Sequence, residues 1–102
     1  MKSQDIELLC LIISSKAYRN ASQQDIAFKL KRSASTVNAS IRKLKNSELI
    51  ITHLSDVKYW PYLDNCIKFL PSVKFYFPDN PDIIDLADAA LPIVIALRNA
   101  QF

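Results

Sequence analysis

The sequence of 102 residues contains no glycine, although an average composition would supply about seven. Glycine takes left-handed backbone conformations without steric cost and lets the backbone approach a phosphate closely. Its absence excludes the glycine-rich nucleotide-binding loops, G-x-G-x-x-G and G-x-x-x-x-G-K-[ST], and it disfavours all-β folds with tight glycine turns. We therefore expect a mainly helical protein.

Long apolar runs are also missing. The longest, Leu8 to Ile13 and Ala89 to Leu97, are well below the ~18 residues of a membrane span. The first residues lack a basic segment leading into an apolar one, so we expect no secretory signal. Cys10 and Cys66 form no C-x-x-C pair, and we interpret them as buried free thiols rather than as a disulfide. A soluble cytoplasmic protein with no membrane partner is expected.

Recognisable catalytic groups are missing as well. The sequence offers no Ser-His-Asp set and no pair of carboxylates with a pocket signature. Its single histidine, His53, matches no zinc-binding spacing when taken with Asp64 and Cys66. We expect no enzymatic activity, no metal and no other cofactor.

Positive charge is present, and it is concentrated in the first half. Residues 1–54 hold nine Lys or Arg against four Asp or Glu, whereas residues 55–102 hold four against six. This division suggests that one face of the protein binds a polyanion.

Capping signals and apolar spacing predict three helices in the first half, at about 3–15, 22–31 and 33–46. A serine stands at or near the start of each, the third being capped by Ser33 or Ser35. The first helix is apolar on nearly all its faces and must be covered on more than one side. The third has a narrow apolar stripe of Val37, Ile41 and Leu44. Two helices joined by a turn of three or four residues form a helix-turn-helix.

The second half is predicted to mix strands and helices. Residues 50–54 and 57–60 suggest a hairpin, and the alternation over 73–77 suggests a third strand. Pro61 suits the first position of a helix. A last helix, from residue 82, should be kinked or split at Pro92.

Three short pieces of sequence carry a family resemblance. They are Ser22-Gln-Gln-Asp25-Ile26-Ala27, then Ser33-Ala-Ser35-Thr36-Val37 followed by Ile41-x-x-Leu44, and finally Glu48-Leu49-Ile50-Ile51. The stretch from Ser22 to Leu54 resembles the winged helix-turn-helix of bacterial transcriptional regulators such as the MarR-like and ArsR-like repressors. The resemblance implies a DNA-binding domain, which we expect over residues 1–78, and we expect the remaining helical tail, residues 79–102, to be a dimerisation element.

The chain departs from this family where the family uses glycine. Lys31-Arg32 occupies the turn between the two helices, and Glu48 stands before the hairpin. Lys or Arg takes a left-handed conformation there at some energetic cost. A hairpin with Ser55-Asp56 at its tip is short, which shifts the expected DNA contacts from the wing to the helix.

The resemblance implies that the third helix enters the major groove of double-stranded DNA. Ser35, Thr36 and Asn38 would then read bases, and the basic side chains would hold phosphates. No acidic residue lies between Arg32 and Ser47, whereas a solvated helix usually mixes charges of both signs. The predicted DNA-binding residues are Lys29, Lys31, Arg32, Ser33, Ser35, Thr36, Asn38, Arg42, Lys43 and Lys45.

The two ends of the chain carry more apolar surface than a small monomer easily buries. We expect a homodimer held by Leu8, Leu11, Ile12, Leu91, Ile93, Ile95 and Leu97. The sequence thus predicts a homodimeric transcriptional regulator that occupies an operator and is nucleoid-associated when bound to DNA. The alternative is an antitoxin-like or effector-binding interaction module, in which a second protein binds the apolar ends of the same scaffold.

Overall fold

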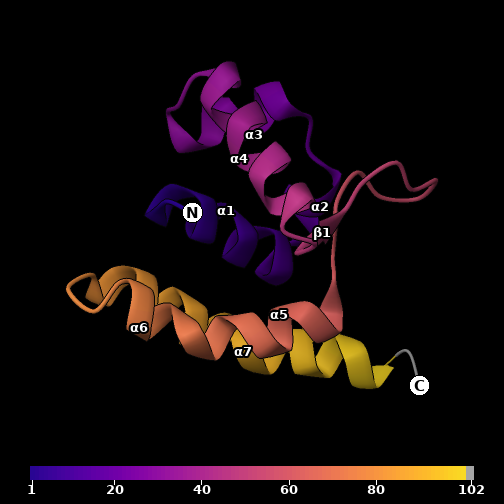
Figure 1. The fold of residues 1–102 in the computed structure, drawn as a ribbon. Helices are drawn as coiled ribbons and strands as arrows, with labels where there is room; N and C mark the ends of the chain where they lie inside the picture. Colours follow the sequence, from indigo (N-terminus) through magenta and orange to yellow (C-terminus); the bar gives the residue numbers. More distant parts are fainter. Residues whose placement is uncertain (101–102) are drawn as a thin grey trace.

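A computed structural model describes residues 1–100, which fold mainly into helices with one small antiparallel hairpin (Figure 1). The coarse fold class, mainly α with a small hairpin, is therefore confirmed. In chain order the elements are α1 (Ser3–Ser14), α2 (Lys16–Asn20), α3 (Gln23–Leu30), α4 (Ala34–Asn46), β1 (Ile50–Ile51), β2 (Trp60–Pro61), α5 (Leu63–Phe69), the 3-10 helix η1 (Leu70–Ser72), α6 (Val73–Tyr76) and α7 (Pro81–Ala100).

The first helix, α1, lies between two layers. One layer holds α3 and α4, and the other holds α5, α6 and α7 (Figure 1). α1 packs against α4 on one side and against α7 on the other. Side chains on several of its faces, including Ile6, Leu9 and Ile12, have no exposed surface. The rest of the same chain therefore supplies the cover that this nearly all-apolar helix requires.

The last helix, α7, runs unbroken through Pro92, so the expected split does not occur. Proline cannot donate a hydrogen bond to the carbonyl of Asp88, four residues earlier. Both residues are exposed, and water can therefore bond to that carbonyl. Among residues 1–100, no helix is both long enough and apolar enough to cross a membrane.

The hairpin is shorter than its sequence pattern suggests. Ile50 pairs with Pro61 and Ile51 with Trp60, and residues 52–59 form a loop between the two strands. Before Trp60 the returning residues do not pair with the outgoing ones; the amides of Lys58 and Tyr59 both donate to the carbonyl of Arg19 instead. The connection between α1 and α3 contains the short helix α2.

Two further predictions for the second half are wrong. Residues 73–76 form α6 rather than a third strand, with Val73 only 1% exposed and Phe75 76% exposed. In a strand both side chains would share one face, whereas the helical turn separates them. Pro61 belongs to β2 and does not open a helix, since α5 begins at Leu63 with Tyr62 as its N-cap.

Candidate functional site

The turn between α3 and α4 is built from side-chain caps and one left-handed residue. Ser22 Oγ accepts the amide of Asp25 at the start of α3, and Ser33 Oγ accepts the amide of Thr36 at the start of α4, both at 3.1 Å. Lys31 ends α3 with φ 55° and ψ 46°, which is the left-handed conformation expected at this position. Ser33, and not Ser35, is therefore the cap of α4.

The orientation of α4 is set by four buried side chains. Val37, Ile41 and Leu44 form the predicted apolar stripe, and Ser40 lies beside them, 1% exposed. The Ser40 hydroxyl donates to Oδ1 of Asp5 on α1 at 2.6 Å. Because this face is fixed against α1, the opposite face of α4 is turned to solvent.

The residues predicted to bind DNA lie on α3, on α4 and in the turn between them, and they differ in how exposed they are. Three are half-buried: Arg32, Thr36 and Asn38. The others are exposed, namely Lys29, Lys31, Ser33, Ser35, Arg42, Lys43 and Lys45. The hydroxyl of Thr36 lies 2.7 Å from that of Ser33, within the cap. The ammonium group of Lys29 lies 5.2 Å from the ring centre of Tyr18.

Arg32 differs from the other predicted cations. Its guanidinium forms an ion pair with Glu7 at 2.9 Å and donates to the carbonyl of Gln4 at 3.3 Å. Both partners belong to α1, so the side chain is held against that helix. Arg32 thus joins the turn to α1, a role that its position in the sequence did not indicate.

The remaining cations of this surface have no acidic partner. In the part of the chain that the structure describes, the ion pairs are Arg32–Glu7 and Arg98–Asp64. Arg42, Lys43 and Lys45 are therefore unneutralised on one exposed helix face. Their charges produce a positive potential that attracts anions.

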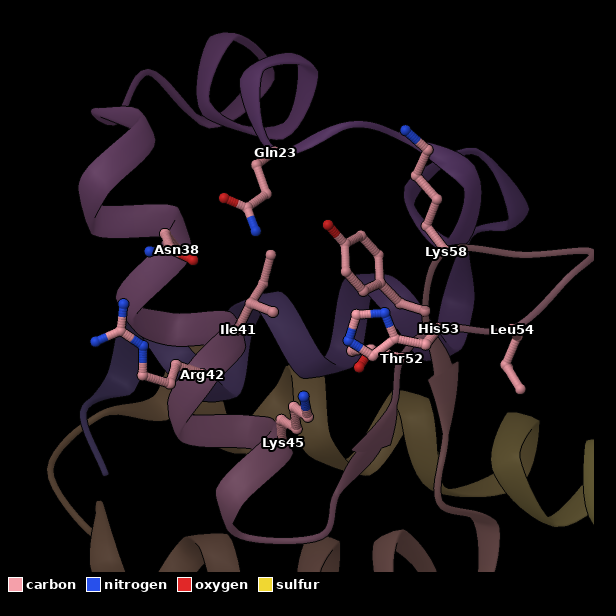
Figure 2. A pocket seen from close by; sticks show the side chains of 10 residues that line it. Gln23, Asn38, Ile41, Arg42, Lys45, Thr52, His53, Leu54 and Lys58 are labelled. Carbon is pink, nitrogen blue, oxygen red and sulfur yellow. The ribbon is translucent and has the colours of Figure 1, made fainter.

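A pocket of about 480 Å³ lies between α4 and the hairpin loop (Figure 2). Asn38, Ile41, Arg42 and Lys45 line it from α4; Thr52, His53, Leu54 and Lys58 line it from the loop; and Gln23 and Tyr59 complete it. Sequence reasoning did not associate the loop residues with α4. Their placement depends on contacts far apart in the chain, which leave no periodic signal.

Arg19 positions the hairpin loop beside α4. Its guanidinium donates to the carbonyls of Ile12 and Ile13 at 3.0 and 2.9 Å, and it lies 5.4 Å from the ring centre of Trp60. Its own carbonyl accepts the amides that begin the return of the loop. These contacts of Arg19 attach the pocket wall to the core.

Tyr59, at the end of the loop, is itself buried. Burial raises its pKa, and a hydrogen bond from Gln23 partly offsets this rise.

The residues predicted to form a dimer interface are not equally accessible. Leu8 and Ile12 have no exposed surface within the single chain, because the surrounding helices cover them. Leu11, Leu91 and Leu97 are half-buried. Only Ile93 and Ile95, at 37% and 38%, are exposed. A second copy would therefore meet α7 rather than the buried faces of α1.

The two thiols are free and buried, as expected. Burial raises the pKa of each to about 12, and Cys66 Sγ also lies 3.3 Å from the carbonyl of Leu49. Neither thiol is a nucleophile at neutral pH, since the thiolate is the reactive form. Within residues 1–100 no three His, Cys, Asp or Glu side chains are grouped so that they could hold a metal ion.

Comparison with known proteins gave no match, whether with protein-family models, with curated protein sequences or with solved structures.

Proposed function

We propose that the protein binds double-stranded DNA through the exposed face of α4 and regulates transcription by occupying an operator. The observation that carries this proposal is the set of unneutralised cations, Arg42, Lys43 and Lys45, on a helix whose other face is fixed to the core. In this proposal α3 and α4 form a helix-turn-helix and the hairpin is a short wing. Such a regulator would act in the cytoplasm, on the nucleoid.

The side chains of α4 divide into two roles in this proposal. Ser35 and Asn38 lie toward the N-terminal half of the helix, where a recognition helix meets base edges. Asn38 has the paired donor and acceptor that suit adenine. The cations further along would hold phosphates, which supply affinity and register but little sequence information. Lys58, across the pocket from α4, adds a phosphate contact that the sequence did not suggest.

The proposal is tested by measuring duplex affinity as a function of salt. The slope of log affinity against log salt is negative, and each phosphate contact adds about 0.9 to its magnitude, which is the quantity compared from here on. The double variant Arg42→Ala/Lys43→Ala should therefore lose about 1.8 from this slope and bind far more weakly. The matched control is Lys68→Ala/Lys74→Ala, which removes two exposed cations from α5 and α6, in the layer on the other side of α1 (Figure 1).

Equal duplex binding by the Arg42→Ala/Lys43→Ala variant and the wild type would reject the exposed face of α4 as the DNA contact. Sequence specificity requires that DNA from upstream of the gene bind more tightly than random duplex at the same salt.

The proposed dimer is tested separately by sedimentation, with Ile93→Glu on α7 as the variant expected to dissociate it.

A second candidate function, a protein-interaction module, is favoured by aromatic side chains far from α4. Phe75 is 76% exposed and Tyr76 69% exposed. A pocket of about 340 Å³ beside them is lined by Met1, Phe69, Tyr76 and Phe77. Exposed aromatic patches mark binding sites for other proteins. Under this alternative, Tyr76→Ala abolishes capture of the partner, while the Arg42→Ala/Lys43→Ala variant retains it.

A further inference from the structure

The pocket between α4 and the hairpin loop has the charge of an anion site. Arg42, Lys45 and Lys58 line it together with His53, and no Asp or Glu is among its lining residues. Figure 2 shows Arg42 on one side of the pocket and Lys58 on the other. None of the three forms an ion pair among residues 1–100. Cations on the two sides of a concave site focus a positive potential within it.

An unpartnered hydroxyl in the same lining is an independent indication of a ligand. Thr52 Oγ1 is buried and has no hydrogen-bond partner among the described residues. Buried polar groups are nearly always bonded to protein, to water or to a ligand. Thr52 is also one of the residues that line the pocket, so a ligand bound there lies next to this side chain.

The pocket also has room and apolar surface for more than an inorganic ion. Its volume, about 480 Å³, falls within the range of about 300–1,000 Å³ that is usual for small-molecule sites. A phosphate group alone would leave most of this space empty. Ile41 from α4 and Leu54 from the loop contribute apolar surface to its lining.

We propose that this pocket binds a small molecule in which a phosphate group is attached to an apolar body, and that this ligand competes with DNA. A guanidinium matches phosphate oxygens in a bidentate arrangement, which Arg42 can offer, and Lys45 and Lys58 supply further charge. The Thr52 hydroxyl bonds to the ligand, and the apolar walls hold its body. The competition, but not the binding itself, rests on the proposed function, because Asn38, Arg42 and Lys45 would serve both the ligand and DNA.

Binding is measured first without DNA, by following backbone amide NMR signals at constant ionic strength. The probes are phenyl phosphate, inorganic phosphate and phenol. Phenyl phosphate should bind saturably, with shifts centred on Thr52 and His53, and about tenfold more tightly than inorganic phosphate because its ring buries apolar surface. Phenol should not saturate. Phenyl phosphate that binds no better than phenol, or that shifts signals elsewhere, would overturn the proposal.

Variants locate the site. Lys45→Ala should weaken phenyl phosphate binding about tenfold, as expected for a charge-assisted contact. Lys43→Ala, which removes the same charge from the same helix but does not line the pocket, is the matched control and should leave that affinity unchanged. Equal losses in the two variants would mean that the probe responds to general charge and that the pocket is not its site.

Thr52→Val separates a ligand contact from a structural role. The substitution removes an unsatisfied buried hydroxyl without changing the shape of the side chain, so the ligand-free protein should melt at the same or a higher temperature. Its affinity for phenyl phosphate should fall about tenfold. Unchanged affinity would contradict the part of the proposal that concerns Thr52.

Competition is measured last, as displacement of a fluorescent duplex by phenyl phosphate, with chloride as the ionic-strength control. If phenyl phosphate binds but no duplex ever does, the proposed function fails and the ligand site stands. If the duplex binds and saturating phenyl phosphate does not displace it, the proposed competition fails while DNA binding stands.

Discussion

Ser40 Oγ donates a 2.6 Å hydrogen bond to Oδ1 of Asp5, although the two residues are 35 positions apart. Both are buried, with Ser40 1% and Asp5 4% exposed. The second carboxylate oxygen of Asp5 accepts the backbone amide of Lys2 at 2.9 Å, so both oxygens are bonded. A buried carboxylate with specific partners is sensitive to geometry. This pair therefore fixes how α4 is turned against α1 and which of its faces remains exposed.

We predict that Ser40→Ala lowers the free energy of unfolding by about 1–3 kcal/mol, because it leaves one oxygen of a buried carboxylate without its donor. The measurement is urea unfolding followed by circular dichroism. Ser35→Ala, on the exposed face of the same helix, should change stability by no more than about 0.5 kcal/mol. A loss in Ser40→Ala no larger than in this control would show that the pair does not stabilise the protein.

Arg32 and Glu7 connect the turn before α4 to α1, and this leads to a second prediction. Arg32→Ala should destabilise the protein by about 1 kcal/mol, since the pair is partly buried and the arginine also bonds to a backbone carbonyl. The slope of log duplex affinity against log salt should stay unchanged, whereas Arg42→Ala should lower it by about 0.9.

The control for this prediction is Glu7→Gln, which breaks the ion pair but keeps Arg32. If Arg32 were a phosphate contact, Arg32→Ala would lower the salt slope and Glu7→Gln would not. Equal slopes in Arg32→Ala, Glu7→Gln and the wild type would confirm that the guanidinium acts within the fold. Stability should decrease in both variants.

Features with a local cause were predictable from the sequence, and features set by distant contacts were not. The cap at Ser33 and the stripe of Val37, Ile41 and Leu44 follow from neighbouring residues, and both are present. The pairing of Arg32 with Glu7 depends on how two helices meet. The hairpin loop depends in the same way on the carbonyl of Arg19. The pocket residues that the loop contributes were therefore missed.

The segment 73–77 shows how a pattern of alternating apolar residues can mislead. Period-two alternation favours a strand, but it decides the structure only when a neighbouring strand is available to pair. Here the preceding residues are already helical, with Val73 continuing at φ −56° and ψ −40°. One further helical turn places Val73 in the core and leaves Phe75 in solvent.

Because the sequence has no glycine, residues with a Cβ adopt left-handed backbone conformations at an energetic cost. This gives a third prediction. Lys31 has φ 55° and Glu48 has φ 56°. A residue with a Cβ pays about 1–2 kcal/mol for this conformation. Glycine avoids this penalty but loses more entropy on folding, by about 0.5–1 kcal/mol. Lys31→Gly and Glu48→Gly should therefore each stabilise the protein by about 0.5–1 kcal/mol.

Alanine variants at the same positions provide the reference, because they remove the side chain but keep the Cβ. Thermal unfolding should rank glycine above alanine at both positions. The two Lys31 variants lose the same charge, so their duplex affinities should fall equally. If alanine were as stable as glycine at position 31, the left-handed conformation would not be a source of strain.

The two buried thiols make stability fall at alkaline pH. Burial raises the pKa of Cys10 and Cys66 from 9.0 to about 12. The unfolded chain therefore releases these protons first, and the stabilisation that is complete below pH 9 is lost as the pH rises toward 12. Within that window each thiol should lower the free energy of unfolding by about 1.4 kcal/mol per pH unit. Above its ordinary pKa of 10.0, the buried phenol of Tyr59 adds a loss of the same sign.

Urea unfolding between about pH 8 and about pH 10.5 measures this dependence. The double variant Cys10→Ala/Cys66→Ala starts from a lower stability because it leaves two small cavities. Its stability should nevertheless vary much less with pH above 9, since the remaining slope comes from Tyr59 and exposed groups. The slope, and not the starting stability, decides the matter. The same steep slope in the variant and in the wild type would show that groups other than the thiols link unfolding to proton release.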